Sequence, residues 1–124
     1  MTYIHCYAAL ELIKLVETKY GKKFDLTIAR RKFAGKDFVS LNIMWVHLEQ
    51  RSFPMTLEEF VDKMDGICMY LNAWNRQELV RTFMMAKPKG NLGLPPRPIV
   101  GVAVPLQLDL PKEVIAEWLG DRIS

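Results

Sequence analysis

Two neighbouring segments of alternating polarity constrain the fold of this chain more than any other feature. Residues 24, 26 and 28 are apolar and alternate with smaller or polar residues, and residues 39, 41, 43 and 45 repeat the pattern. Side chains along a strand point alternately to its two faces, so each segment has the pattern of a strand with one buried face. Between the segments lies Ala34–Asp37, which contains a glycine. Two alternating runs around such a turn predict a β-hairpin.

Apolar side chains at three- and four-residue spacing predict a helix on each side of this hairpin. The first helix covers Tyr3 to Tyr20 and is followed by Gly21, where a left-handed cap requires glycine. The next helix opens at Thr56, which with Glu59 forms a capping box.

Two more helices are expected further along the chain. Asn75 with Glu78 resembles a second cap and opens a third helix. Pro111 is suited to the start of a last short helix, and Gly120 to its end.

The stretch from Lys87 to Pro98 contains four prolines and two glycines, which exclude a helix or a central strand. We expect it to be an exposed, comparatively mobile loop that takes part in contacts. The alternative is that its leucines fold back and fasten the loop to the sheet.

Alternation resumes from Val102 to Leu110 and predicts a third strand. Pro105 places that strand at an edge, because proline cannot donate to a ladder.

The expected order is therefore α-β-β-α-α-β-α. This order predicts an α+β fold in which a small, three-stranded, mainly antiparallel sheet is covered by helices. With 124 residues and no long linker, residues 1–124 form a single domain. The side chains expected to be buried against the helices are Leu26, Ile28, Val39, Leu41, Ile43, Val104 and Leu106.

Motifs for catalysis or metal binding are missing from the sequence. Its two histidines lack the spacing of a metal site, and it has no nucleophile elbow or Walker loop. The segment 89–93 faintly resembles a phosphate-binding loop, but without a strand before it or a helix after it we interpret it as a flexible loop. Cys6 and Cys68 fall on apolar helical stripes and are expected to be buried thiols. We therefore expect a non-enzymatic protein without cofactor or metal.

No apolar run approaches the roughly 20 residues that span a bilayer, and no secretory signal is visible at the N-terminus. The formal net charge of +3 is too small to indicate a polyanion partner by itself.

The distribution of charge is more informative than its sum. Basic residues crowd the hairpin turn, and no acidic residue occurs between Glu78 and Asp109. Acids gather instead on the second helix. The pattern indicates docking to a protein with an acidic surface, with nucleic acid as a second possibility, and the alternative is solubilising charge on exposed loops. Trp74, between two helices, is the aromatic residue best placed as a partial surface anchor. The candidate partner-binding residues are Arg30, Arg31, Lys32, Lys36, Trp74, Lys87, Lys89 and Arg97.

Several segments resemble the domain of unknown function 3067 family, which occurs in cyanobacteria and plastid-bearing eukaryotes. They are Tyr20–Asp25, Met44–Pro54, Tyr70–Trp74 and Val102–Leu108, within a similarity that spans roughly Leu10 to Leu110. One departure from the family pattern is a longer Pro- and Gly-rich stretch before the last strand.

The resemblance implies a link to photosynthesis or plastid maintenance and carries over no catalytic residue. We expect an assembly or auxiliary factor for a photosynthetic or energy-converting complex, located in the chloroplast stroma or the cyanobacterial cytoplasm. The alternative is an RNA-binding accessory protein that uses the basic hairpin edge.

Overall fold

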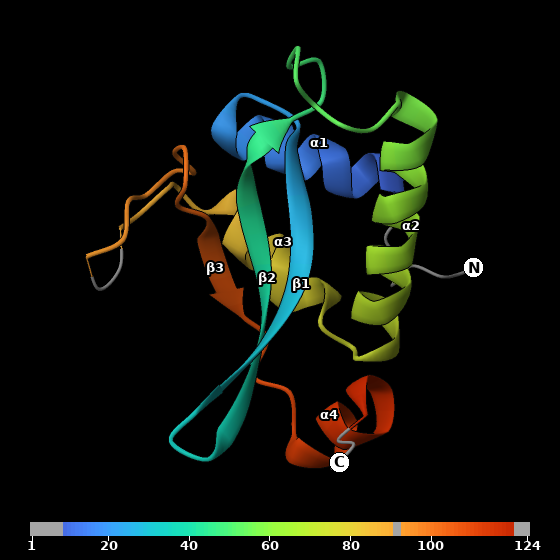
Figure 1. Ribbon diagram of the computed structural model, residues 1–124, viewed down its shortest axis with the longest axis vertical. Helices are drawn as coiled ribbons and strands as arrows, with labels where there is room; N and C mark the ends of the chain where they lie inside the picture. The colour runs from blue at the N-terminus through green and yellow to red at the C-terminus, as the bar shows by residue number, and fades with distance from the viewer. Residues whose placement is uncertain (1–8, 91–92, 121–124) are drawn as a thin grey trace.

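A three-stranded antiparallel sheet, in the order β1-β2-β3, forms the centre of the computed structural model, which describes residues 9–90 and 93–120 (Figure 1). The predicted α+β class and the order α-β-β-α-α-β-α are both confirmed. The elements are α1 (Ala9–Tyr20), β1 (Phe24–Phe33), β2 (Lys36–His47), α2 (Leu57–Ala73), α3 (Gln77–Met85), β3 (Val104–Gln107) and α4 (Lys112–Leu119).

The predicted hairpin is the longest pairing in the sheet. β1 and β2 pair from Phe33↔Lys36 to Phe24↔His47, with an irregularity between Phe24 and Leu26. The turn is only two residues long, because Ala34 and Gly35 adopt φ values of 52° and 78°. Two positive φ values define the primed turn that matches the twist of paired strands.

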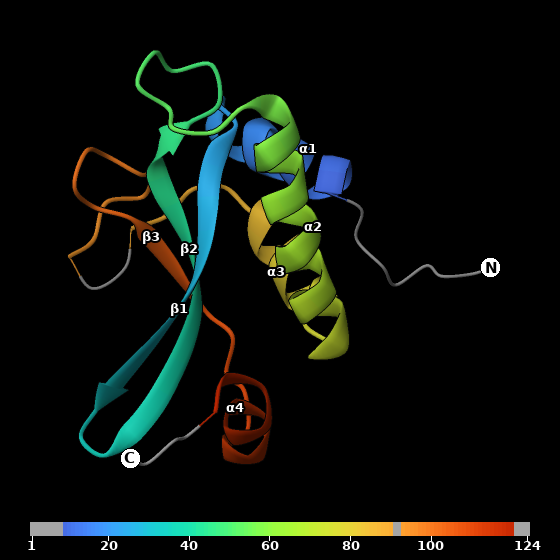
Figure 2. The same ribbon diagram turned by 45° about the vertical axis from the view of Figure 1, so that its right-hand side comes forward.

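Helices α1, α2 and α3 cover one face of the sheet, and α4 packs near the end of the hairpin that carries its turn (Figure 2). The side chains of Leu41 and Ile43, on the central strand, are completely buried. They meet a cluster contributed by the helices, in which Leu12, Phe60 and Met64 are equally inaccessible. Two predicted core residues, Ile28 and Leu106, are only partly buried.

The helix boundaries follow local signals at most positions. The capping box of Thr56 and Glu59 is present at the start of α2, with side chain to backbone distances of 3.1 and 2.9 Å. Gly21, with φ 87°, ends α1 and donates to the carbonyl of Glu17. The predicted start of α1 at Tyr3 lies outside the described residues, as does Cys6.

The predicted cap formed by Asn75 and Glu78 is wrong. Asn75 takes a left-handed conformation with φ 57°, and the amide of Arg76 donates to the carbonyl of Leu71. This is the hydrogen bonding of a Schellman motif, so Asn75 ends α2 and does not open α3.

The third strand is shorter than the pattern from Val102 to Leu110 predicts. At its start, Ile99 and Val102 pair with each other around Gly101, at φ 84°, so Val102 belongs to the loop. At its end, Asp109 adopts φ 52° and turns the chain away. Pro105 does lie on an edge strand, because β3 pairs only with β2 in the described sheet.

Replacing Ile43 with a smaller residue tests whether packing of the helices on one face of the sheet stabilises this fold. Ile43→Ala is expected to lower the free energy of unfolding by about 2–5 kcal/mol, because it removes buried methylene groups and leaves a cavity. Denaturant unfolding measures the change, with Thr82→Ala on the exposed side of α3 as control, expected to change stability by less than about 0.5 kcal/mol. Equal effects of the two variants would contradict the assignment of Ile43 to the core.

Candidate interaction surface

The basic residues of the hairpin lie on two different faces of the sheet. In the strand register Arg30 faces Val39, and Lys32 faces Asp37, on the side covered by the helices. Arg31 pairs with Phe38 on the opposite, open side. The alternation of β1 therefore divides a run that is continuous in the sequence. We call Arg30, Arg31, Lys32 and Lys36 the hairpin group.

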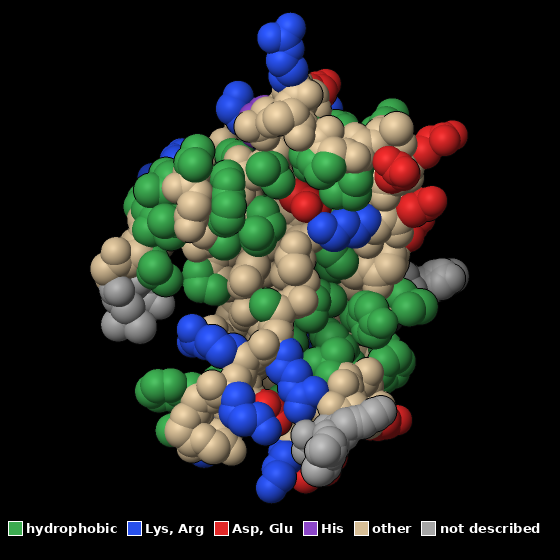
Figure 3. Space-filling view, in the orientation of Figure 1, with side chains coloured by type: hydrophobic (Ala, Val, Ile, Leu, Met, Phe, Trp, Pro, Cys, Tyr) green, Lys and Arg blue, Asp and Glu red, His purple; other side chains and the backbone are tan. Residues whose placement is uncertain are grey.

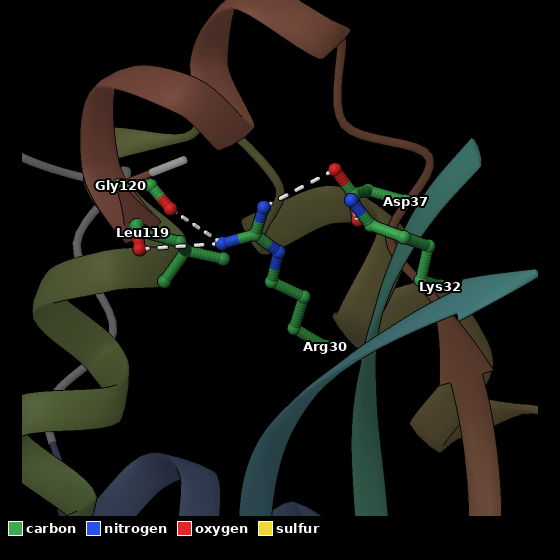
Figure 4. Close-up of polar contacts among 5 residues, drawn as sticks. All are labelled: Arg30, Lys32, Asp37, Leu119 and Gly120. Carbon is green, nitrogen blue, oxygen red and sulfur yellow. Dashed lines mark hydrogen bonds and ion pairs between the residues drawn. The ribbon is translucent and has the colours of Figure 1, made fainter. Parts of the chain in front are cut away.

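Arg30 is engaged in holding α4 against the hairpin (Figure 4). Its Nη1 donates to the carbonyl oxygens of Gly120 at 2.7 Å and Leu119 at 3.3 Å, at the C-terminal end of α4. Its Nη2 donates to Oδ2 of Asp37 at 3.1 Å. A cation at the C-terminal end of a helix is favourable for the helix dipole. The position of Arg30 therefore indicates a structural role.

Lys32 shares the same carboxylate, at 3.8 Å from Oδ1 of Asp37, but its side chain is largely exposed. The Arg30 guanidinium, followed by the charge of Lys32, holds the pKa of the Asp37 carboxyl below its usual range. Arg31 and Lys36, both exposed, are the members of the hairpin group that form no ion pair with a carboxylate among the described residues.

A second set of basic residues surrounds the C-terminal ends of α1 and α3. Lys19, in the last turn of α1, donates from Nζ to the carbonyl oxygens of Phe83, at 2.8 Å, and Ala86. Arg97 of the loop donates to the carbonyl of Tyr20 at 3.4 Å. Lys87 and Lys89 line a hollow together with Lys19. We call Lys19, Lys87, Lys89 and Arg97 the basic corner.

In the part of the chain that the structure describes, the four residues of the basic corner form no ion pairs. Among residues 9–90 and 93–120, no ion pair joins any of its four members to a carboxylate. Desolvation, followed by repulsion from Arg97, lowers the pKa of Lys19. The sequence predicted three of these residues from an acid-free segment but missed Lys19, whose partners on α3 are distant in the chain.

After residue 92 the structure describes the part of the loop that follows the basic corner. Pro98 is buried, and the short Ile99–Val102 bridge ends in an exposed tip, with Val100 86% exposed. The predicted exposure of Lys87, Lys89 and Arg97 is confirmed. Leu94 folds toward the open sheet face, where it lines a hollow with Arg31 and Phe38. The loop is therefore exposed as expected, and Leu94 folds back onto the sheet as in the alternative arrangement, while the part of the loop in contacts stays a prediction.

Trp74 does not form a surface anchor, so that prediction is wrong. Its side chain is only 5% exposed and packs between the rings of Tyr70 and Trp118, at centroid distances of 5.3 and 6.3 Å. The contact joins the end of α2 to α4, and it buries the indole because helices distant in sequence close over it.

Acidic side chains lie on the other side of the molecule. Glu58, Glu59, Asp62 and Asp65 are exposed on α2. In the space-filling view acidic groups appear over α2, whereas lysine and arginine gather over the lower part of the hairpin (Figure 3). In both ribbon views the loop and the hairpin turn lie away from α2 (Figures 1 and 2).

Among the described residues, Cys68 is buried and His47 contacts neighbouring groups. Burial, followed by the nearby charges of Asp65 and Glu11, raises the pKa of Cys68 to about 12, which keeps the thiol protonated at neutral pH. Nδ1 of His47 lies 2.9 Å from the carbonyl oxygen of Leu48, and the ring packs on Phe24. Within the described residues no group of three potential metal ligands occurs, and no helix is long and apolar enough to cross a membrane.

These features define an α+β domain with basic residues around its proline-rich loop and acidic residues on α2. The chain belongs to the family described as domain of unknown function (DUF3067), whose model matches residues 10–119. The chain is also similar to the Alr2454 protein from the cyanobacterium Nostoc sp. strain PCC 7120, whose structure was solved by solution NMR. The two sequences are 34% identical. The superposition has a TM-score of 0.66 and covers 91% of this chain and 97% of that chain. No curated protein matches the chain.

The ion pair of Asp37 predicts a pH-dependent stability. The pKa of Asp37 is lower in the folded protein than in the unfolded chain, where it is about 3.9. The ionised carboxylate therefore stabilises the fold fully above about pH 3.9, and this stabilisation is lost as the pH falls through the pKa of the folded state. The difference in free energy of unfolding between wild type and Asp37→Asn should be largest at neutral pH and should disappear once the pH is below the lowered pKa of Asp37. Denaturant titrations at several pH values measure it.

Asp62→Asn, on the exposed side of α2, is the control for this experiment and should follow the wild-type profile. A constant difference between wild type and Asp37→Asn at every pH would contradict a role for the ionised carboxylate.

Proposed function

We propose that this domain is a non-enzymatic protein-interaction module that binds a partner with an acidic surface through its basic corner and the adjacent loop tip. The observation that carries the proposal is a set of four cations without carboxylate partners in the described structure, beside an exposed apolar tip. Interfaces combine an apolar centre with a polar rim, and charge complementarity steers association.

The build of the loop supports this role. Prolines restrict its φ angles, and the Ile99–Val102 bridge holds the tip in place, so less conformational entropy is lost on docking. Val100 is nearly fully accessible, and Lys87, Lys89 and Arg97 precede it in a segment that contains no acidic residue. A partner that offers an apolar recess rimmed by Asp and Glu would match this surface.

The proposed biological role is an assembly or auxiliary factor for a photosynthetic or energy-converting complex, in the cyanobacterial cytoplasm or the chloroplast stroma. Its support is the cyanobacterial origin of the similar Nostoc protein, together with the distribution that the family resemblance implies.

Charge reversal at the basic corner tests the proposal. Lys87→Glu/Lys89→Glu is expected to reduce capture of partners from a cyanobacterial extract by roughly tenfold, a loss of about 1.4 kcal/mol in binding. Both side chains are exposed and have no ion pair in the described structure, so the melting temperature should be nearly unchanged. Quantitative pull-down with the purified full chain measures the effect.

The matched control is Arg51→Glu/Lys112→Glu, which makes the same change in net charge at exposed positions outside the basic corner. Equal loss in both variants would indicate a general charge effect, and identical partners at identical yield in the first variant would reject the proposed surface.

A second candidate function, binding of single-stranded RNA, rests on the open face of the hairpin. There Arg31 pairs with Phe38, and Lys36 with Phe33, so that each cross-strand pair joins a cation to an aromatic ring. The two rings are 38% and 67% exposed. Bases stack on exposed aromatic rings while cations contact phosphates, which is the usual chemistry of single-strand binding.

A salt titration separates this candidate from protein binding. Binding of single-stranded RNA should weaken log-linearly with salt, with a slope of about 0.7 per contacted phosphate. Phe33→Ala/Phe38→Ala should weaken binding at every salt concentration without changing the slope. No retention on RNA at about 50 mM salt, where phosphate contacts are strongest, would reject RNA binding.

A further inference from the structure

A hollow of about 390 Å³ lies inside the basic corner, beneath the proline-rich loop. Its walls combine cationic side chains with apolar and aromatic ones, and those that matter here are Lys19, Lys87, Lys89, Tyr20, Phe83 and Pro96. Sites for small molecules have volumes of about 300–1,000 Å³ and a similar mixture of apolar walls with a few polar groups.

Lys19, one of the three cations that line the hollow, is held in place by the fold. Nζ of Lys19 is fixed by the carbonyls of Phe83 and Ala86 and lies 4.5 Å from the centre of the Phe83 ring. These hydrogen bonds also satisfy carbonyl groups at the end of α3, whose partial negative charge would otherwise oppose an anion. Arg97 lies close enough to add to the positive potential at Lys19. An anion in the hollow would reduce this repulsion.

Tyr20, which also lines the hollow, has a hydroxyl group without a hydrogen-bond partner among the described residues. The residue is 6% exposed, and the hydroxyl itself is buried. Burial raises the pKa of Tyr20 to about 12, so the group remains an O–H donor at neutral pH. A buried polar group without a partner is costly, and an acceptor brought within reach of this hydroxyl would lower that cost.

Gly90, which lines the hollow, lies close to the backbone of Leu94. A Cβ atom at Gly90 would lie 2.9 Å from the carbonyl oxygen of Leu94, so the backbone can approach this closely only with glycine. Lys89 and Pro96, which flank these two positions in the sequence, both line the hollow.

We propose that the hollow binds a small organic phosphate monoester. The phosphate lies against Lys19, Lys87 and Lys89, and the apolar body of the ligand lies against Phe83 and Pro96. Three ammonium groups provide the charge-assisted hydrogen bonds that phosphate oxygens accept, and the aromatic wall distinguishes an organic ester from inorganic phosphate. This inference goes beyond the proposed protein partner and does not depend on it.

Titration of the full chain followed by amide chemical shifts tests the inference, with phenyl phosphate, inorganic phosphate and phenol as probes. Phenyl phosphate should give saturable shifts at Tyr20, Ala86 and Gly90, with a dissociation constant on the order of 1 mM. Inorganic phosphate should bind at least about fivefold more weakly, and phenol should not saturate.

Variants distinguish binding in the hollow from general anion binding. Lys87→Ala/Lys89→Ala should weaken phenyl phosphate binding roughly tenfold, whereas the matched control Arg51→Ala/Lys112→Ala should leave it unchanged. Lys19 is left intact because it also fastens α1 to α3. The inference is overturned by scattered or non-saturating shifts, by equal affinity for inorganic phosphate, or by equal effects of the two double variants. None of these outcomes alters the pull-down result expected for a protein partner.

Discussion

Burial of the sheet on one side only is the constraint on which the rest of the structure depends. Three strands cannot enclose a core alone, and α1, α2 and α3 all lie against the face that carries Leu41 and Ile43. Because side chains alternate along a strand, Ser40 and Asn42, which lie between those buried residues in the sequence, point to the other face of the sheet. The same alternation continues to the turn and sends Arg30 toward α4 and Arg31 to the open side. A basic run in the sequence is thus divided between two surfaces by the geometry of the strand.

Local signals were sufficient to predict most of this fold. The hairpin follows from period-two alternation, and the start of α2 from the side chains of Thr56 and Glu59, each of which needs only residues nearby in the chain. The errors occur where distant segments decide the outcome. The short β3 is limited by the turn at Gly101 and the left-handed Asp109, and Trp74 is buried because Trp118 of α4 packs on it. Neither effect is visible in the pattern of neighbouring residues.

The sequence was sufficient to predict the candidate binding residues of the basic corner that lie in the loop. Lys87, Lys89 and Arg97 lie in a segment free of acids, and the structure brings them to one corner. Lys19 could not be assigned to that corner, because a basic residue in the last turn normally stabilises its own helix, whereas this one caps α3. Arg30 shows the same behaviour toward α4. Part of the positive charge of the chain is therefore used to close helix ends, and the net charge of +3 does not measure the charge offered to a partner.

The proline-rich loop connects the two candidate surfaces physically. Lys89, Gly90 and Pro96 line the hollow of the basic corner, whereas Leu94 lines the hollow on the open sheet face. Gly90 and Leu94, which line different hollows, lie close to each other. A change in the path of the loop at this point would therefore alter a wall of each hollow. A ligand that binds one loop conformation more tightly in one hollow would then change the shape of the other, and by linkage the coupling would act equally in both directions.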